Sequence, residues 1–123
     1  MTARPAFDLN MTDVNECKVF HLHGRLMDQQ QADRLMHALE EELASGHHQV
    51  VLDMSQLQYM NSTGLNIVIG LLTKTRNAGG EVMIAGMSQG VRQLFLVTKL
   101  DSVFTILPTV DEAVARLRSG AVK

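Results

Sequence analysis

The chain has 123 residues, of which 46% are hydrophobic and 20% are charged, and its formal net charge at pH 7 is −2. This length and this balance predict one globular domain, residues 1–123, with enough apolar residues for a core but little room for a large active-site cleft. The near-neutral charge and the lack of a lysine and arginine run exclude a disordered polyelectrolyte and give no support to a nucleic-acid-binding surface.

Cysteine content and hydropathy indicate where the protein works. Cys17 is the single cysteine, so it has no internal disulfide partner, which suits a reducing cytoplasm. The first ten residues lack the apolar core of a secretory signal, and the most apolar helical stretch, residues 65–72, is too short to span a bilayer. We therefore expect a soluble cytoplasmic protein without direct membrane insertion, in which Cys17 is inert.

The N-terminal part predicts a β-hairpin. Residues 7–11 and 16–23 have the composition of strands, and the polar link 12–15 between them is typical of a hairpin connection. Gly24 is expected to end the second strand.

A helix is predicted next. Asp28 and Gln31 have the spacing of a capping box, and Gly46 suits the helix end. The apolar residues between them fall at helical spacing: Ala32, Leu35, Met36, Leu39 and Leu43. Near the far end, the acidic residues 40–42 oppose the helix dipole, so we expect them to be solvated.

The central stretch combines a buried strand with a helix. Residues 50–52 form a short apolar run, which predicts a strand closed by Asp53 and Ser55, and residues 57–60 form a second strip. Asn61 or Ser62 then occupies the place of a helix N-cap. The following apolar residues share one helical face: Leu65, Val68, Ile69 and Leu72. In an open α/β sheet this corner faces the crevice where ligands and partners bind.

The C-terminal part continues the alternation of strands and helices. Gly79–Gly80 is expected to end the central helix, before strands at residues 81–85 and 103–107. Ser88 is expected to cap the helix between these strands, and Thr109 forms a capping box with Glu112 before the last helix. The inward-facing residues of the third helix are predicted to be Val91, Leu94, Phe95 and Thr98. The order ββαβαβαβα predicts an α/β fold with a mostly parallel mixed sheet, an N-terminal antiparallel hairpin and about four helices.

Catalytic and metal-binding motifs find little support. His21 and His23 share one side of a strand and His47 and His48 lie in a loop, but zinc needs three or four protein ligands and no cysteine or carboxylate has ligand spacing with them, so surface histidines are the favoured interpretation. Ser62 lacks the preceding glycine of a nucleophile elbow, and no nucleotide-binding glycine loop is present. We expect neither an enzyme nor a cofactor.

The run 59–65, Tyr-Met-Asn-Ser-Thr-Gly-Leu, resembles the phosphoacceptor motif D-S-[ST]-G-L of the anti-sigma factor antagonists, whose fold is the STAS domain. Gly24, residues 50–53, residues 76–81 and residues 99–104 are also similar to members of that family, so the resemblance covers nearly the whole chain.

The resemblance implies a bacterial partner-switching function in transcription regulation. In the family the first hydroxyl of the motif, here Ser62, is phosphorylated by a serine kinase that is also the anti-sigma factor, and Thr63 fills the next hydroxyl position. The unphosphorylated antagonist binds this kinase and frees the sigma factor. The family's aspartate before the phosphoacceptor is replaced by Asn61, and the acidic residue expected soon after Gly24 corresponds to Asp28 with its spacing shifted by one.

The expected partner-binding surface surrounds the phosphoacceptor. Its candidate residues are Asp28, Asn61, Ser62, Thr63, Gly64, Asn66, Ile67, Met87 and Ser88. Gly64, Ile67 and Leu71 form a second apolar stripe on the central helix, which either packs on a neighbouring helix or offers a patch to the partner.

Three classes of function follow. The first is the phosphorylation-switched antagonist of an anti-sigma factor. The second is a STAS accessory or scaffold module of a transporter or another regulatory complex, in which Ser62 serves only as a helix cap. The third is a small enzyme, which the missing catalytic motifs disfavour.

Overall fold

The computed structural model describes residues 7–119, which form a five-stranded sheet with four α-helices and one 3-10 helix. In chain order the elements are β1 (Phe7–Val14), β2 (Cys17–Leu26), α1 (Gln29–Ala44), β3 (Gln49–Met60), α2 (Ser62–Asn77), β4 (Glu81–Ala85), α3 (Gln89–Val97), the 3-10 helix η1 (Leu100–Ser102), β5 (Thr105–Leu107) and α4 (Val110–Arg118).

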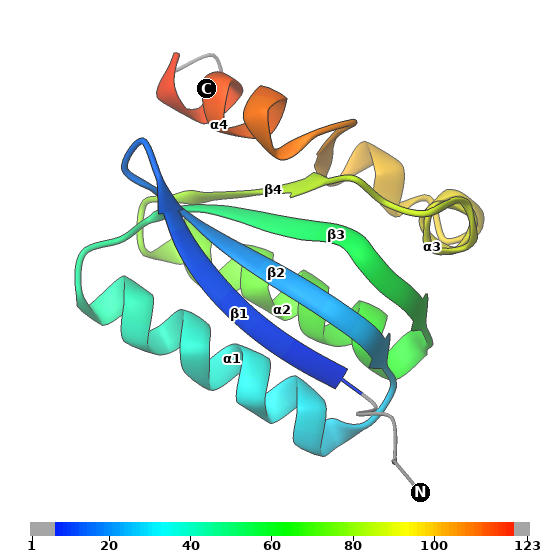
Figure 1. The fold of residues 1–123 in the computed structure, drawn as a ribbon. Helices are drawn as coiled ribbons and strands as arrows, with labels where there is room; N and C mark the ends of the chain where they lie inside the picture. Colours follow the sequence, from blue (N-terminus) through cyan, green and yellow to red (C-terminus); the bar gives the residue numbers. More distant parts are fainter. Residues whose placement is uncertain (1–6, 120–123) are drawn as a thin grey trace, which may run out of the picture.

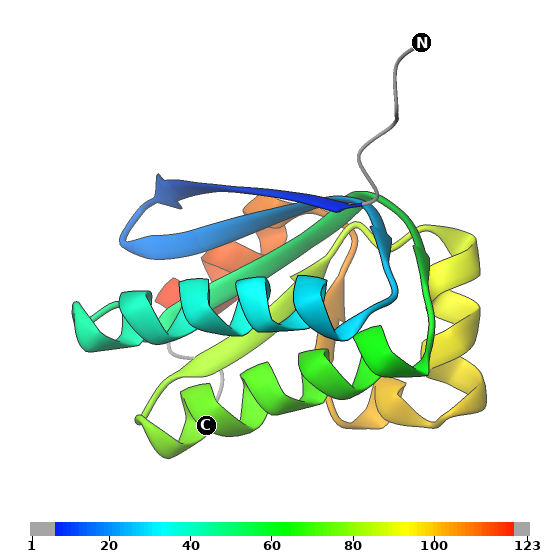
Figure 2. The same cartoon turned by 90° about the horizontal axis from the view of Figure 1, so that it is seen from below.

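The sheet has the strand order β1-β2-β3-β4-β5, in which β1 pairs antiparallel with β2 and every other pair is parallel. This confirms the predicted mixed sheet with an N-terminal hairpin. Helices α1 and α2 lie side by side against one face, and α4 crosses the other face near β4 (Figures 1 and 2). Helix α3 packs against β3 at the end of the sheet where β3 finishes, so one groove is lined both by α3 and by the first residue of α2.

Apolar side chains fill both layers. The larger core lies between the sheet and helices α1, α2 and α3, and its largest fully buried members include Phe20, Leu52 and Phe95. A smaller core lies under α4, where Val51 and Val114 belong to the same cluster. Because a central strand is covered on both faces, consecutive residues of β3 are buried, as the run at residues 50–52 predicted.

The hairpin turn is tighter than predicted. The predicted link 12–15 is wrong, because β1 continues to Val14 and only Asn15 and Glu16 form the turn. Their φ angles are 50° and 72°, which is the left-handed pair that a two-residue hairpin turn requires.

Strands β2 and β3 are also longer than predicted. Gly24 does not end β2 but sits within it at φ 87°, next to a register shift in the pairing with β3. Asp53 and Ser55 do not close β3, because a bulge between these strands lets the ladder continue to Met60. The two strips predicted on either side of Ser55 are therefore one strand of 12 residues.

Two predictions at the C-terminal side are corrected. Thr98 is exposed at the end of α3, where its hydroxyl donates to the carbonyl oxygen of Leu94, so it does not face inward. Val103 lies outside the last strand, which begins only at Thr105, after η1 and a turn at residues 103–104. The apolar side chain of Val103 is exposed.

The acidic residues near the end of α1 are paired, not merely solvated. Glu42 accepts from Lys18 at 3.4 Å and from His47 at 2.8 Å, so it links α1 to the hairpin and to the following loop. Glu40 contacts Lys74 of α2 at 2.9 Å. The pairs with Lys18 and Lys74 could not be predicted from the sequence, because these lysines lie far from the helix along the chain.

The predicted helix caps are present. Asp28 and Gln31 form a complete capping box at α1. At α4 only half of the predicted box forms: Thr109 accepts from the backbone N–H of Glu112, but the Glu112 carboxylate accepts from the Thr109 hydroxyl instead of the Thr109 N–H. Ser88 caps α3 by accepting from the N–H of Val91. Within residues 7–119, no helix combines the length and apolarity that crossing a membrane requires.

Candidate functional site

The corner between β3 and α2 is held by Asn61. This residue is the N-cap of α2, and its Oδ1 accepts from the N–H of Gly64 at 3.1 Å. Its Nδ2 donates to the carbonyl oxygen of Met27 at 3.0 Å, in the connection that leads into α1. An ionised aspartate could accept from the Gly64 N–H but could not donate to the Met27 carbonyl. The amide therefore links the start of α2 to the connection before α1, which a carboxylate would not do.

Gly64 allows the helix to approach the end of β2. A Cβ at this position would lie 2.5 Å from the carbonyl oxygen of Leu26 and 2.8 Å from Cγ of Met60. Gly64 is buried and has no surface to offer a partner. Its place in the motif is therefore explained by close packing.

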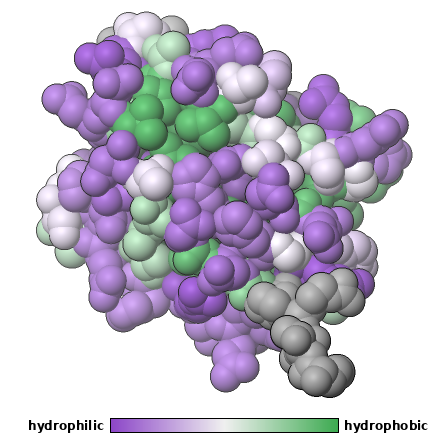
Figure 3. Space-filling model, viewed as in Figure 1, coloured by the Kyte–Doolittle hydropathy of each residue, from purple (hydrophilic) through white to green (hydrophobic). Residues whose placement is uncertain are grey.

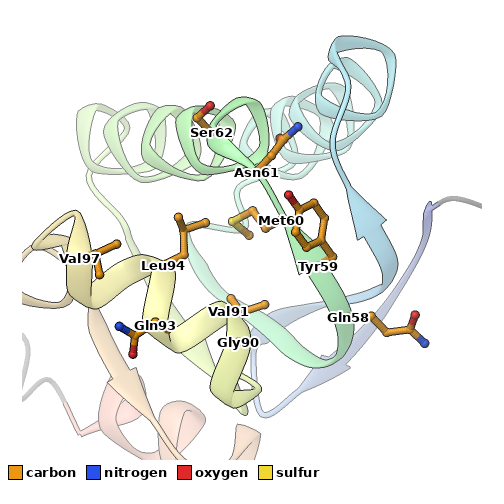
Figure 4. Close-up of a pocket in the computed structure, with 10 residues that line it drawn as sticks. All are labelled: Gln58, Tyr59, Met60, Asn61, Ser62, Gly90, Val91, Gln93, Leu94 and Val97. Carbon is orange, nitrogen blue, oxygen red and sulfur yellow. The ribbon is translucent and has the colours of Figure 1, made fainter.

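Ser62 is the first residue of α2 and is exposed. Because Asn61 is the cap, the Ser62 hydroxyl is not needed for capping, and it has no hydrogen bond within residues 7–119. In Figure 4 this hydroxyl points away from α3 toward the outside. The neighbouring Thr63 is half-buried. A negative group on Ser62 would lie at the positive end of the helix dipole.

An apolar groove of about 580 Å³ adjoins Ser62, between the end of β3 and α3. Across it Met60 and Leu94 point toward each other, whereas Gln58 and Gln93 point away (Figure 4). The lining residues are all uncharged: Gln58, Tyr59, Met60, Asn61, Ser62, Gly90, Val91, Gln93, Leu94 and Val97. Such a surface suits an uncharged partner group, because a charged one would lose hydration without compensation.

A second hollow, of about 260 Å³, lies between α1 and α2. Thr63, Asn66 and Ile67 line it together with Gln29 and Ala32. Asp28 is exposed one residue before Gln29. Four of the predicted partner-binding residues therefore lie at or next to this hollow, beside Ser62: Asp28, Thr63, Asn66 and Ile67. The stripe of Gly64, Ile67 and Leu71 belongs mainly to the interior, since α1 packs against α2 there.

Met87 and Ser88 do not line the apolar groove. Ser88 caps α3 and half-buried Met87 packs against the larger core. The part of α3 that does line the groove, from Gly90 to Val97, was missed by the sequence reasoning. The available signal was Val97, an apolar residue outside the buried stripe that is 64% exposed.

The rest of the described chain offers no metal site of the usual kind. Among residues 7–119, no three histidine, cysteine, aspartate or glutamate side chains converge as metal ligands would. Burial raises the pKa of the Cys17 thiol, the direction that makes a cysteine less reactive.

The fold and the comparison with known families agree on the class of protein. The chain belongs to the STAS domain family, whose model matches residues 8–113. This membership agrees with the expectation of a regulatory protein rather than an enzyme.

Individual relatives and structures add detail. The chain is 25% identical over 112 residues to BtrV of Bordetella bronchiseptica, a provisionally named anti-sigma factor antagonist, with 91% of this chain and 96% of BtrV covered. An anti-sigma factor antagonist from Mycobacterium paratuberculosis has the same fold, with a TM-score of 0.82, 24% identity and coverage of 96% of this chain and 99% of that one. SpoIIAA in its unphosphorylated form matches with a TM-score of 0.78, 21% identity and coverage of 91% and 97%. The phosphorylated form of SpoIIAA matches with a TM-score of 0.68, 22% identity and coverage of 90% and 98%.

Proposed function

We propose that this protein is an antagonist of an anti-sigma factor and that phosphorylation of Ser62 releases it from that partner. The observation that carries the proposal is the position of the Ser62 hydroxyl, which is exposed at a helix N-terminus and not used as the helix cap. The proposed partner is an anti-sigma factor with serine kinase activity. Because such a partner controls a sigma factor, we expect the switch to operate in the cytoplasm. Relatives named as anti-sigma factor antagonists support this assignment.

A charge mechanism accounts for the release. Phosphorylation adds about −1.5 to −2 charges and three acceptor oxygens. In the free domain this charge is tolerated, because it lies at the N-terminus of α2. In the complex it would lie beside the uncharged groove, where docking must remove its water. A penalty of about 3 kcal/mol weakens binding more than a hundredfold, so no large change of shape is needed.

Phosphorylation is tested first. Candidate serine kinases are incubated with the protein and ATP, and the modified residue is located by mass spectrometry. We expect phosphate on Ser62 and its loss in Ser62→Ala, whereas Thr63→Ala, which removes the adjacent half-buried hydroxyl, retains it. Phosphate confined to another residue contradicts the proposal.

Binding to the phosphorylating kinase is tested next by titration calorimetry. Ser62→Ala should bind whether or not ATP is present, and Ser62→Asp should bind about a hundredfold more weakly. Gln93→Asp places the same charge on the other side of the groove and separates a general charge effect from one specific to Ser62. Equal affinity of Ser62→Ala and Ser62→Asp refutes the charge mechanism and favours a scaffold role for the domain.

A further inference from the structure

A second group of polar side chains lies on the sheet face that α4 covers only in part. Val19 and Val51 pack beneath α4. Two residues further along the same strands, and therefore on the same face, come His21 and Asp53. Thr12 of β1 pairs with Val19, so it shares this face. The surface seen from the side of β1 is mainly hydrophilic (Figure 3).

Three of these side chains form a hydrogen-bonded chain. His21 Nδ1 lies 2.7 Å from Asp53 Oδ2, and His21 Nε2 lies 2.9 Å from Thr12 Oγ1. The other carboxylate oxygen of Asp53 accepts from the backbone N–H of Ser55 at 3.0 Å. The side chains of His21 and Asp53 are 25% and 13% exposed, whereas Thr12 is exposed. The chain therefore runs from a partly buried carboxylate to a hydroxyl that solvent and reagents can reach.

The carboxylate determines which way the hydrogen bonds run. An ionised carboxylate can only accept, so Nδ1 of neutral His21 carries the proton. Nε2 is then the acceptor, and the Thr12 hydroxyl donates to it. Hydroxyl, imidazole and carboxylate stand in the order of an activated nucleophile, its general base and the group that orients the base.

We propose that Thr12 is an acyl-acceptor site that takes one acyl group from an ester or thioester with a good leaving group. The Thr12 oxygen adds to the carbonyl carbon while its proton moves to His21 Nε2. The tetrahedral adduct then collapses, the bond to the leaving group breaks, and the proton on His21 passes to the departing oxygen or sulfur. The products are an ester at Thr12 Oγ1 and the free alcohol or thiol, and His21 is neutral again.

A donor for the developing oxyanion is available on the same face. Asn10 pairs with His21 across β1 and β2, and its Oδ1 accepts from His23 Nε2 at 2.9 Å. Its Nδ2 group makes no hydrogen bond within the described part of the chain, so it is free to donate.

This site is independent of the proposed function at Ser62. Asp53 and Met60 are seven residues apart on β3, a separation of roughly 23 Å at the usual rise of a strand. Acylation of Thr12 can therefore be measured in the Ser62→Ala variant. Its success or failure says nothing about phosphorylation.

The probe is p-nitrophenyl acetate, with release of p-nitrophenolate followed by absorbance and the acetylated residue located by peptide mass spectrometry. We expect one acetyl group on Thr12 in the unaltered chain and in Thr12→Ser, and none at residue 12 in Thr12→Val. His21→Gln should lower the rate at residue 12 at least tenfold, because a general base contributes about a hundredfold or more. Thr73 and Thr98, whose hydroxyls donate to backbone carbonyls and not to an imidazole, serve as internal controls.

Asp53 is a positioning residue and needs a separate readout. In Asp53→Asn the acetylation rate should fall, and the ¹⁵N chemical shifts of the His21 ring should show loss of the Nδ1–H tautomer. Circular dichroism checks that each variant is folded. If Asp53→Asn does not fold, the comparison of Thr12→Ser with Thr12→Val still tests whether Thr12 is the acylated residue. Acetyl groups found only on lysines or histidines overturn the proposal. So does a rate at Thr12 that equals those at Thr73 and Thr98, or that is unchanged in His21→Gln.

Discussion

Neighbouring residues at the β3–α2 corner have different roles, although they belong to one short motif. Asn61 carries the cap and the bond to Met27, Gly64 allows close packing, and Ser62 is left free. The four residues 61–64 thus comprise two structural positions, Asn61 and Gly64, the half-buried Thr63, and one accessible hydroxyl on Ser62. The accessible position is the one at which chemistry can change without disturbing the fold.

Gly64→Ala should destabilise the protein by about 1–3 kcal/mol, because the added methyl group meets the Leu26 carbonyl and Met60. Urea unfolding followed by circular dichroism measures the change. Gly90→Ala is the matched control: a Cβ added there would meet no atom within 4 Å outside its own helix backbone, so replacing this helical glycine should stabilise the protein by up to about 1 kcal/mol. Equal effects of the two substitutions would argue against the close approach.

The carboxyl of Asp53 should make stability depend on acid pH. Burial acts to raise its pKa, but hydrogen bonds from the Ser55 N–H and from His21 hold the pKa below the ordinary value of 3.8. A lowered pKa contributes stability above the unfolded-state value, and that contribution is lost as pH falls through the folded-state value. The unfolding free energy should therefore decline more steeply below pH 4 in the unaltered chain than in Asp53→Asn, by urea titration at several pH values.

At the scale of elements, the β1–β2 hairpin has a turn whose second residue does not suit the turn's backbone conformation. Its turn places Asn15 and Glu16 in the left-handed region, a conformation suited to Asn-Gly. Glutamate tolerates it poorly, because its Cβ crowds the backbone there. Asn15 tolerates this conformation, so it is Glu16 that the tight pairing of two long strands must hold in place.

Glu16→Gly should stabilise the protein by up to about 1 kcal/mol, since glycine adopts a φ of 72° without strain. The expected sign is opposite to the usual entropic cost of glycine. Glu16→Ala removes the same carboxylate and keeps the Cβ, so it should bring no such gain. Thermal unfolding of the two variants makes the comparison, and equal midpoints would show that charge and not backbone strain matters.

At the scale of the whole molecule, two helical layers of unequal thickness enclose the sheet. Helices α1 and α2 cover one face with the larger core, whereas α4 alone covers part of the other. Cys17 lies beneath α4 and is 2% exposed. Its thiol can report whether this thinner layer opens.

Leu117→Ala should speed the labelling of Cys17 by a thiol reagent at least tenfold, because Leu117 is 7% exposed and belongs to the core under α4. A loss of about 2–4 kcal/mol is expected for such a truncation. Leu35→Ala in α1 makes a comparable cavity in the other layer. If both variants label Cys17 equally at equal stability, α4 does not open separately and the whole domain unfolds as one unit.

The sequence predicted the strand and helix order, the helix N-caps, the capping box at α1 and the mixed sheet, because these depend on local periodicity and cap residues. It failed where distant strands decide the outcome. The continuation of β3 through Asp53 and Ser55 depends on a bulge against β2. The apolar groove depends on α3 lying beside the end of β3, which no local pattern encodes. The bonds of His21 to Thr12 and Asp53 likewise join three strands.

The length of β3 has a practical consequence for labelling. The strand extends 12 residues from Gln49 to Met60, about 36 Å at the usual rise, and the hairpin tip lies at its starting end. A fluorophore or a surface tether attached at Asn15 would stand at the far pole from Ser62. Docking at the serine could then be followed by energy transfer or on a sensor chip without the label obstructing the incoming protein.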